Sequence, residues 1–399
     1  MYLEQFKRLF HKTPVYIKSY LLFELGYYLY SKVYTYRKLD SIHYREVREH
    51  VTHKRTKELY EQVKLYLVNE PDLTKYTSEA FLNKDLITLP NINTLLSYIL
   101  DDTPNKQMDE LLDIIKIKCA PIIKPSGPLS YRNMSSIMMT NNLNILHKPF
   151  AFYAYMYFIR RAFNCYMYTL GFTNIIDPST KLRVWVKYNK TAVNKIPLVF
   201  IHGFGVGIVP YINKIRKLSA DRTLILPELP NISYDLYTAA PPPSADNIAD
   251  ALYDILVKRG VELIDIMGHS YGTMILNIFQ NKYPHMCNYK TYAEPVCFYI
   301  QFGQMASTTY NFSLDTCGNI LEYLCYLFVY RDMYIQYINR RGMFLEHFLI
   351  KNLDDKTNII LAKDDSFVPS SWVHAYITRH YPHINISMID GGHGSFIFM

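Results

Sequence analysis

The chain has 399 residues, of which 49% are hydrophobic, and a formal net charge of +8 at pH 7. This length exceeds what a single hydrophobic core usually organises, so we expect one large domain with a helical extension, or two domains. The cations are spread along the chain in short runs, which argues against a nucleic-acid-binding face and favours solubility or contact with an anionic membrane surface.

Targeting and redox signals favour an intracellular protein. The first residues carry Glu4, Lys7 and Arg8 where a cleaved secretory signal needs an apolar core, so we expect no secretion by that route. No stretch reaches the uncharged apolar length of a membrane span. The six cysteines lack CxxC spacing, which favours reduced thiols over a zinc site or a disulfide framework.

Residues 1–147 are expected to form a helical N-terminal region. Within 14–36, a run rich in Leu and Tyr is interrupted by Lys18, Glu24 and Lys32, which is typical of an amphipathic helix that packs on the body or lies on a membrane. Peripheral membrane contact through these helices is therefore one hypothesis. Further helical patterns cover 40–69, 91–101 and 108–119, and prolines between 121 and 128 mark a connector.

An aromatic helix is predicted from Lys148-Pro149 to the residue before Gly171. Arg160 and Arg161 interrupt its apolar run after less than half the length of a membrane span. We therefore expect this helix to pack in the core or at an interface rather than to cross a bilayer.

From Leu182 onward, short apolar runs alternate with helical segments, the pattern of a parallel α/β sheet. Ser244 is predicted to open one such helix and Gly260 to close it. We therefore expect an α/β domain over 148–399. Strands are predicted at 182–188, 197–201, 222–226, 262–267, 289–295, 358–362 and 385–389.

The sequence Gly268-His269-Ser270-Tyr271-Gly272 joins a predicted buried strand to a predicted helix. The two glycines suit a sharp reversal in which neighbouring backbone comes too close for side chains. We expect Ser270 in strained backbone, exposed at the tip of the turn, where it could act as a nucleophile. An ordinary glycine-rich turn is the alternative interpretation.

The loop His202-Gly203-Phe204-Gly205 follows the predicted strand 197–201. Attack of a serine on an acyl carbonyl creates an oxyanion, which needs backbone N–H groups already pointed at it. Where a serine lies in a strand–turn–helix reversal, one donor is the backbone N–H of the residue after the serine, here Tyr271. The other is a backbone N–H of the earlier loop. Phe204 is the first candidate for that second donor, and Gly205 is the next.

Ser270 would need a base, and the base an orienting carboxylate. Asp364 and Asp365 follow the predicted strand 358–362, and His393 lies among glycines after the last strand. The order serine, acid, histidine is the one that the strand–turn–helix architecture requires. Glu294, at the end of another predicted strand, is an alternative acid. His269 adjoins the nucleophile and is interpreted as packing or as lining the pocket.

On these motifs the chain resembles the α/β-hydrolase superfamily over roughly residues 182–399. The resemblance implies Ser270 as nucleophile, His393 as general base and then acid, and Asp365 as the orienting acid. Asp365 is preferred to Asp364 because family members commonly place the acid three residues before a Val-Pro pair. More narrowly, the chain resembles a mostly fungal group of hydrolase-like proteins with a long helical N-terminal region.

An aromatic and aliphatic segment at about 296–351 interrupts the predicted strands and is expected to form a helical cap over Ser270. Such a cap would shape an apolar acyl pocket and exclude water, so we predict hydrolysis of lipid or other apolar carboxylic esters. No metal or organic cofactor is implied. The alternatives are an acyltransferase that uses the same residues and a non-catalytic scaffold that binds a membrane or a partner.

Overall fold

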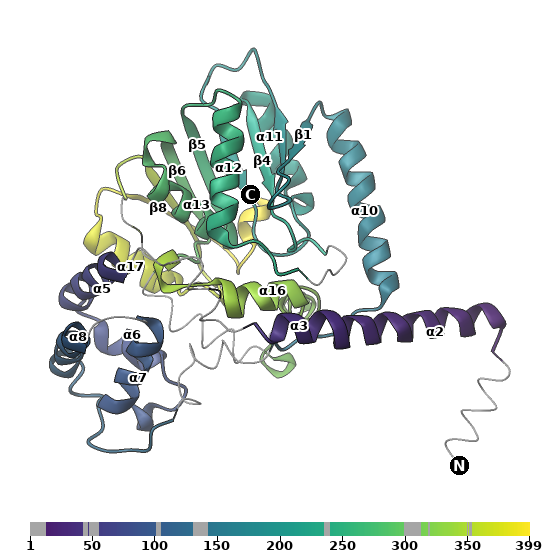
Figure 1. The fold of residues 1–399 in the computed structure, drawn as a ribbon. Helices are drawn as coiled ribbons and strands as arrows, with labels where there is room; N and C mark the ends of the chain where they lie inside the picture. The colour runs from purple at the N-terminus through teal and green to yellow at the C-terminus, as the bar shows by residue number, and fades with distance from the viewer. Residues whose placement is uncertain are drawn as a thin grey trace.

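The computed structural model describes residues 13–42, 47, 56–100, 105–130, 143–234, 240–298, 313–317, 320–348, 350 and 353–399. Eight strands form one sheet at its centre (Figure 1). They are β1 (Thr173–Ile176), β2 (Arg183–Lys187), β3 (Leu198–Ile201), β4 (Leu224–Glu228), β5 (Ile264–His269), β6 (Cys287–Ala293), β7 (Thr357–Ala362) and β8 (Asn385–Ile389).

The strand order is β1-β2-β4-β3-β5-β6-β7-β8. Strand β2 runs antiparallel to both of its neighbours, and all pairs from β4 to β8 are parallel. The prediction of a mostly parallel α/β sheet is therefore confirmed. The seven predicted strands are present, but β1 was missed because its four residues show no alternation and depend on pairing with β2.

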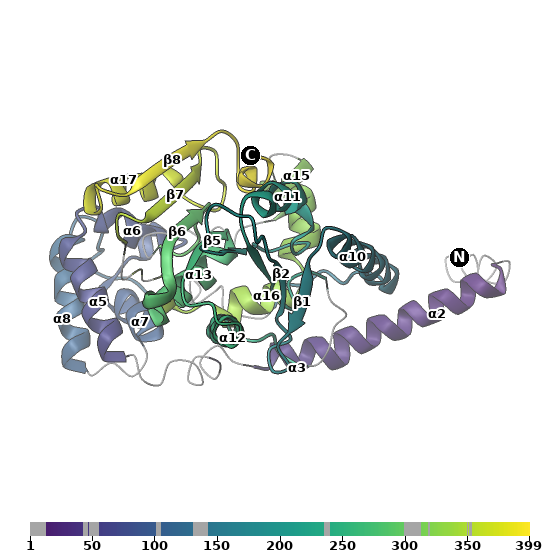
Figure 2. The same cartoon turned by 90° about the horizontal axis from the view of Figure 1, so that it is seen from above.

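Helices cover both faces of the sheet, as predicted (Figure 2). Alternate residues of β3 divide between the faces, with Val199 and Ile201 on one and Leu198 and Phe200 on the other. The first face packs against α12 (Ala245–Lys258), α13 (Tyr271–Lys282) and α17 (Ser370–His380). The second packs against α11 (Ile212–Asp221), the end of α10 (Phe150–Thr169) and the C-terminal 3-10 turn Ser395–Phe398.

The boundaries of α12 follow the capping residues that the sequence indicated. The Ser244 hydroxyl accepts a hydrogen bond from the Asn247 amide at 3.1 Å, which satisfies one of the free donors of the first turn. Gly260 ends the helix with φ +68°, a left-handed conformation that glycine adopts without steric cost.

The N-terminal region is helical, as predicted. Helix α2 (Val15–Leu29) continues through a π-helical segment, Tyr30–Tyr36, into α3 (Arg37–Asp40). A second group has a hydrophobic core of its own and consists of α5 (Thr56–Asn69), α6 (Leu73–Glu79), α7 (Leu89–Ile99) and α8 (Asn105–Lys118). Of the helical segment predicted over 40–69, the part from Thr56 to Asn69 is α5, and most of the part before it lies outside the described residues. The division of the chain at residue 147 stays a prediction.

The second group of helices packs on α17. The ring of Tyr76 lies 5.2 Å from that of Trp372, and Lys75 places its ammonium 3.9 Å from the same indole. Arg379 pairs with Asp72 at 3.1 Å. These contacts attach the N-terminal helices to the end of the sheet that carries β7 and β8.

The predicted insertion separates β6 from β7, and its described part is helical. It contains α15 (Ile320–Leu324), a π-helical segment, Cys325–Tyr330, α16 (Met333–Tyr337), a second π-helical segment, Ile338–Gly342, and a 3-10 turn, Leu345–Phe348. Throughout the described part of the chain, no helix combines the length and the apolarity that a bilayer crossing would need.

Candidate active site

Ser270 occupies a strained turn between β5 and α13. Its φ of 51° and ψ of −123° lie outside the regions that L-residues normally occupy. A Cβ on Gly268 would stand 2.6 Å from the Gly272 carbonyl oxygen, and one on Gly272 would stand 2.3 Å from that of Ile201. Both glycines of the motif are therefore required by the close approach of neighbouring backbone, as the sequence predicted.

The expectation that the turn exposes Ser270 is wrong, because only 8% of the residue is accessible. The loop after β3 lies directly on it, and a Cβ on Gly203 would come within 2.9 Å of the Ser270 Cβ. The sequence shows that the turn projects from the sheet, but it does not show what packs on its tip.

The structure brings Ser270, His393 and Asp365 together. The Ser270 Oγ lies 2.7 Å from the His393 Nε2, and the His393 Nδ1 lies 2.8 Å from the Asp365 Oδ2. The side chain of Asp365 is fully buried, and its Oδ1 accepts hydrogen bonds from the amides of Phe367 and Val368 at 2.9 and 2.8 Å. These donors fix the carboxylate, which leaves Oδ2 for the imidazole.

Asp364 is exposed. Its amide donates to the Gly391 carbonyl oxygen at 3.0 Å, which links the end of β7 to the loop that carries His393. Of the two adjacent aspartates, only Asp365 therefore meets the imidazole.

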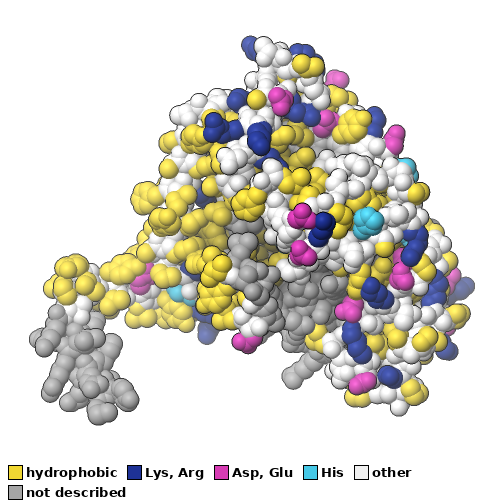
Figure 3. Space-filling model, turned by 180° about the vertical axis from the view of Figure 1, so that it is seen from behind, with side chains coloured by type: hydrophobic (Ala, Val, Ile, Leu, Met, Phe, Trp, Pro, Cys, Tyr) yellow, Lys and Arg dark blue, Asp and Glu magenta, His cyan; other side chains and the backbone are white. Residues whose placement is uncertain are grey.

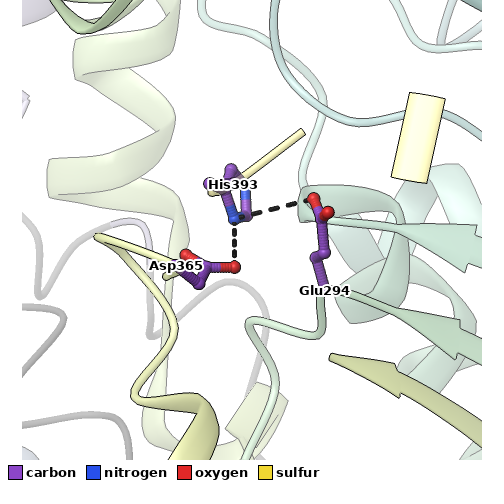
Figure 4. A group of neighbouring side chains, drawn as sticks. All are labelled: Glu294, Asp365 and His393. Carbon is purple, nitrogen blue, oxygen red and sulfur yellow. Dashed lines mark hydrogen bonds and ion pairs between the residues drawn. The ribbon is translucent and has the colours of Figure 1, made fainter. Parts of the chain in front are cut away.

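Glu294, the alternative acid, also faces His393 but from farther away (Figure 4). Its Oε2 lies 3.9 Å from the His393 Nδ1, beyond hydrogen-bond distance. The buried carboxylate instead accepts hydrogen bonds from the amides of Gly394 and Phe396, at 2.5 and 2.9 Å. It contacts His269 Nε2 at 2.8 Å. Glu294 thus holds the segment that presents His393.

The two carboxylates determine the protonation chemistry of His393. Burial lowers the pKa of His393, but the charge and hydrogen bond of Asp365, together with the charge of Glu294, outweigh burial and raise it above its ordinary value. Burial raises the pKa of Glu294, but the hydrogen bond from His269, the charge of His393 and the Phe396 amide lower it overall. Glu294 is therefore an anion at neutral pH.

His269 is part of a buried hydrogen-bond network behind the serine. Its Nδ1 lies 2.6 Å from the Tyr211 hydroxyl, which also accepts a hydrogen bond from the Gly203 amide at 3.3 Å. Burial lowers the pKa of His269. A neutral ring with its proton on Nε2 satisfies both neighbours, donating to Glu294 and accepting from Tyr211. The network runs from the loop after β3 to Glu294, and nothing in the sequence around Tyr211 signals this role.

His202 fixes the loop after β3. Its Nε2 accepts a hydrogen bond from the Leu229 amide at 2.9 Å, and its Nδ1 lies 2.7 Å from the Gly203 carbonyl oxygen. Burial lowers the pKa of His202 to about 4, so the ring is neutral and Nδ1 is the donor. His202 therefore holds the peptide that precedes Phe204, a role that the motif alone did not reveal.

The predicted oxyanion donors flank Ser270. The rings of Phe204 and Tyr271 stack with centroids 4.3 Å apart, which holds the loop after β3 against the first residue of α13. The N-terminus of a helix presents unpaired N–H groups and a partial positive charge, which suit an anion. Gly205, the other candidate, has φ +127°, a conformation that favours glycine. The assignment of Phe204 and Tyr271 as oxyanion donors stays a prediction.

Apolar residues of the insertion approach two neighbours of the Ser270 group, Gly205 and Phe367. A Cβ built on Gly205 would lie 3.9 Å from a methyl of Val329. The Tyr330 ring stacks on Phe367 at 5.0 Å, and Phe367 meets the His393 ring edge-on at 5.3 Å. Val329 and Tyr330 of the insertion therefore lie next to the loop after β3 and to Phe367, and a cap over Ser270 stays a prediction.

A cavity of 1210 Å³ lies beside the site and reaches Tyr271. Its wall combines Tyr337 and Ile338 of the insertion with the charged cluster of Arg160, Arg183 and Glu228. Arg160 lies 2.9 Å and Arg183 3.3 Å from Glu228. The wall is mixed, so this cavity is more polar than the apolar pocket with few polar groups that the composition of the insertion predicted.

Glu294, Asp365 and His393 are also the kinds of side chain that bind metals, with candidate ligand atoms within 4.8 Å of one another. Their lone pairs, however, already have protein partners. The Asp365 Oδ1 accepts two amides, both Glu294 oxygens accept amides, and His393 bonds Ser270 and Asp365. A cation here would have to displace these hydrogen bonds, so the donor set fits proton transfer better than metal binding.

Comparison with known proteins gives one partial relative and several structural likenesses. No family model matches the chain. Over 104 residues it is 27% identical to a Caenorhabditis elegans protein described as abhydrolase domain-containing protein abhd-5.2. The match covers 25% of this chain and 23% of that protein, so it spans about a quarter of the relative's length.

Among solved structures, the chain is similar to a carboxylesterase of the thaumarchaeon Nitrososphaera gargenis, with a TM-score of 0.41 and 16% identity over 57% of this chain and 93% of that one. It is also similar to MGS-M2, an α/β-hydrolase enzyme from a deep-sea metagenome, with a TM-score of 0.41 and 18% identity over 56% and 91%. A thermophilic esterase of Thermogutta terrifontis has a TM-score of 0.39 and 15% identity over 56% and 91%. The narrower resemblance to a fungal group stays a prediction.

Proposed function

We propose that this chain, which has the α/β-hydrolase fold, is a serine hydrolase that cleaves carboxylic esters of apolar acids. The observation that carries the proposal is the continuous hydrogen-bonded series from the Ser270 Oγ through His393 to Asp365, at 2.7 and 2.8 Å. A serine in strained backbone, an imidazole on its hydroxyl and a buried carboxylate on the far nitrogen are the parts that activate a hydroxyl nucleophile.

The reaction would proceed through an acyl-enzyme. His393 Nε2 takes the Ser270 proton as Oγ attacks the carbonyl carbon, and the N–H groups of Phe204 and Tyr271 hold the oxyanion. Collapse breaks the bond to the alcohol oxygen, which receives the proton from His393. Water then gives a proton to His393 and attacks the acyl carbon, and the acid leaves as Ser270 regains its proton.

An apolar substrate is favoured by the side chains around the serine. Phe204, Val329, Tyr330 and Phe367 bring aromatic and aliphatic groups close to Ser270 and His393. Such a lining gives little to a sugar or a phosphate but accepts an acyl chain. We place the acyl group beneath the segment Cys325–Tyr330.

The proposal is tested with p-nitrophenyl esters of increasing acyl length. We expect hydrolysis that improves from acetate to medium chains and that Ser270→Ala reduces at least about a thousandfold. Ser371 is an exposed serine on α17, so Ser371→Ala is the matched control. It should hydrolyse the esters as fast as the wild type does. Equal hydrolysis by Ser270→Ala and the wild type would contradict the proposal.

The approach of the insertion to Gly205 and Phe367 also favours acyl transfer as a second candidate. A cap over Ser270 would limit the access of water and leave the acyl-enzyme available to another alcohol or an amine. Product analysis in the presence of added glycerol or an amine separates the two reactions, since hydrolysis yields only free acid. An acyl-acceptor product formed in preference to the acid would identify a transferase.

A further inference from the structure

Helix α2 leaves the body of the molecule and exposes an extensive apolar surface (Figures 1 and 2). None of its 15 residues is buried. Between Val15 and Tyr34, which we call the α2 arm, thirteen large hydrophobic side chains are at least 38% exposed. Figure 3 shows hydrophobic side chains along the length of the arm. A contiguous apolar surface of this kind marks an interaction site.

One side of the arm is fixed to the protein. Glu24 accepts hydrogen bonds from the amides of Phe150 and Ala151 at 2.9 and 3.2 Å, which caps the N-terminus of α10. The rings of Phe23 and Tyr27 meet Phe150 edge-on at 4.9 and 5.4 Å. Because this side is attached, the rotation of the helix is set, and so is the side that faces outward.

The outward side is aliphatic. Leu22, Leu25, Leu29 and Val33 follow one another at helical spacing and are 62, 54, 50 and 50% exposed. Helical geometry places them opposite the side that contacts α10. An amphipathic helix that lies in a membrane interface presents such a side to the acyl chains.

The charge of the exposed surface is positive. The two acids in this stretch are turned to the protein: Glu24 caps α10, and Asp40 accepts a hydrogen bond from the Leu143 amide at 2.6 Å. The cations between residues 15 and 40 are Lys18, Lys32, Arg37 and Lys38. Tyrosine and lysine side chains at the border of an apolar surface suit the headgroup region of a bilayer.

We propose that the α2 arm docks on an anionic lipid surface, lying in the interface with Leu22, Leu25 and Leu29 among the acyl chains. The charge decides against a second copy of the chain on this side. In a dimer formed through this side, the cations of the two arms would repel each other, whereas anionic lipid headgroups neutralise them. The arm would hold the hydrolase at the surface where apolar esters are found.

The test is sedimentation of the full chain with vesicles of phosphatidylcholine, with and without phosphatidylserine. We expect binding that needs phosphatidylserine and weakens with salt. The variant Leu22→Asp/Leu25→Asp should bind at least about tenfold more weakly, because two aliphatic side chains lose their burial and two negative charges are added. Leu65→Asp/Ile117→Asp is the matched control, since these residues are 64 and 78% exposed on α5 and α8.

Three results would overturn the proposal. The first is a wild-type chain that does not sediment with either vesicle, and the second is an arm variant that binds as the wild type does. The third is a wild-type dimer that the arm variant dissociates while vesicle binding is unchanged, which would assign the arm to a second copy. Ser270→Ala should bind vesicles normally, so the outcome is independent of the proposed hydrolase reaction. Circular dichroism of each variant reports its folding.

Discussion

Oε2 of Glu294 lies 3.9 Å from Nδ1 of His393, close enough for its charge to act but beyond hydrogen-bond distance. His393 therefore bonds one carboxylate and is influenced by two. Glu294 follows β6, where the sequence offered it as an alternative acid, and the structure places it in the same group as Asp365 and His393.

Glu294→Gln should shift the pH dependence of the reaction. The base must be neutral, and the Glu294 charge stabilises protonated His393 and raises its pKa. Removal of that charge lowers the pKa of His393, so the acid limb of kcat/KM should move to lower pH while kcat falls. A lower kcat with an unmoved limb would mean that Glu294 acts only by holding the Gly394 and Phe396 amides.

The choice between the adjacent aspartates has its own test. Asp365→Asn should lower kcat at least about a thousandfold, because the amide no longer stabilises the imidazolium that forms during attack. Asp364→Asn should stay within about twofold of the wild type, since Asp364 is exposed and the carboxylate that bonds His393 is that of Asp365. Steady-state kinetics of the pair measures this, and comparable losses in both would refute the assignment of Asp365.

Gly272→Ala should destabilise the turn. The new methyl would stand 2.3 Å from the Ile201 carbonyl oxygen, so β3 or α13 must shift. We expect a loss of about 1–3 kcal/mol in the free energy of unfolding, measured by urea denaturation, and a larger relative loss of activity. Gly26→Ala in α2 is the control, because a Cβ there meets no atom within 4 Å. A neutral Gly272→Ala would contradict the close packing of the turn.

Buried neutral histidines make the fold sensitive to acid. His202 has a pKa lowered to about 4 by burial, whereas in the unfolded chain it titrates near 6.5. Between these values the unfolded state binds more protons, so the free energy of unfolding falls as pH falls. The titration of His202 alone should lower the free energy of unfolding by about 2 kcal/mol as the pH falls from 7 to 5. The raised pKa of His393 acts in the opposite direction, so the comparison is made against His202→Asn.

The free energy of unfolding of His202→Asn is measured with urea at pH 7 and at pH 5. The loss between the two pH values should be about 2 kcal/mol smaller than in the wild type. An unchanged pH dependence would mean that His202 does not titrate between the two values. In that case the acid sensitivity would have to come from other groups.

Much of the sheet could be predicted because short apolar runs and turn residues are local signals. The seven predicted strands and the Ser244 cap depend on neighbours in sequence, and they are present. Strand β1 was missed because an edge strand of four residues is stabilised by its partner, not by its own pattern. Burial of Ser270 was missed for a related reason, since the covering loop comes from far away in the chain.

For the site, chain order indicated Ser270, His393 and a set of candidate acids, because each follows a strand at the same edge of a parallel sheet. The preference for Asp365 over Asp364 came from the resemblance, and it is Asp365 that lies 2.8 Å from His393. The residues that hold the side chains of Ser270, Asp365 and His393 and the neighbouring loop in place could not be predicted. Tyr211 and His202 act through single hydrogen bonds to a residue on another element, and no local pattern marks such a pair. A sequence can indicate which side chains reach the edge of the sheet, whereas their partners depend on packing.

The central claim is that Ser270 is the nucleophile. The most direct measurement is mass spectrometry of the peptide modified by a fluorophosphonate, which reacts with activated serine hydroxyls. We predict a single adduct on Ser270, lost in Ser270→Ala and strongly slowed in His393→Ala, because the imidazole takes the proton as Oγ attacks. An adduct on another residue, or undiminished labelling of Ser270→Ala, would contradict the account.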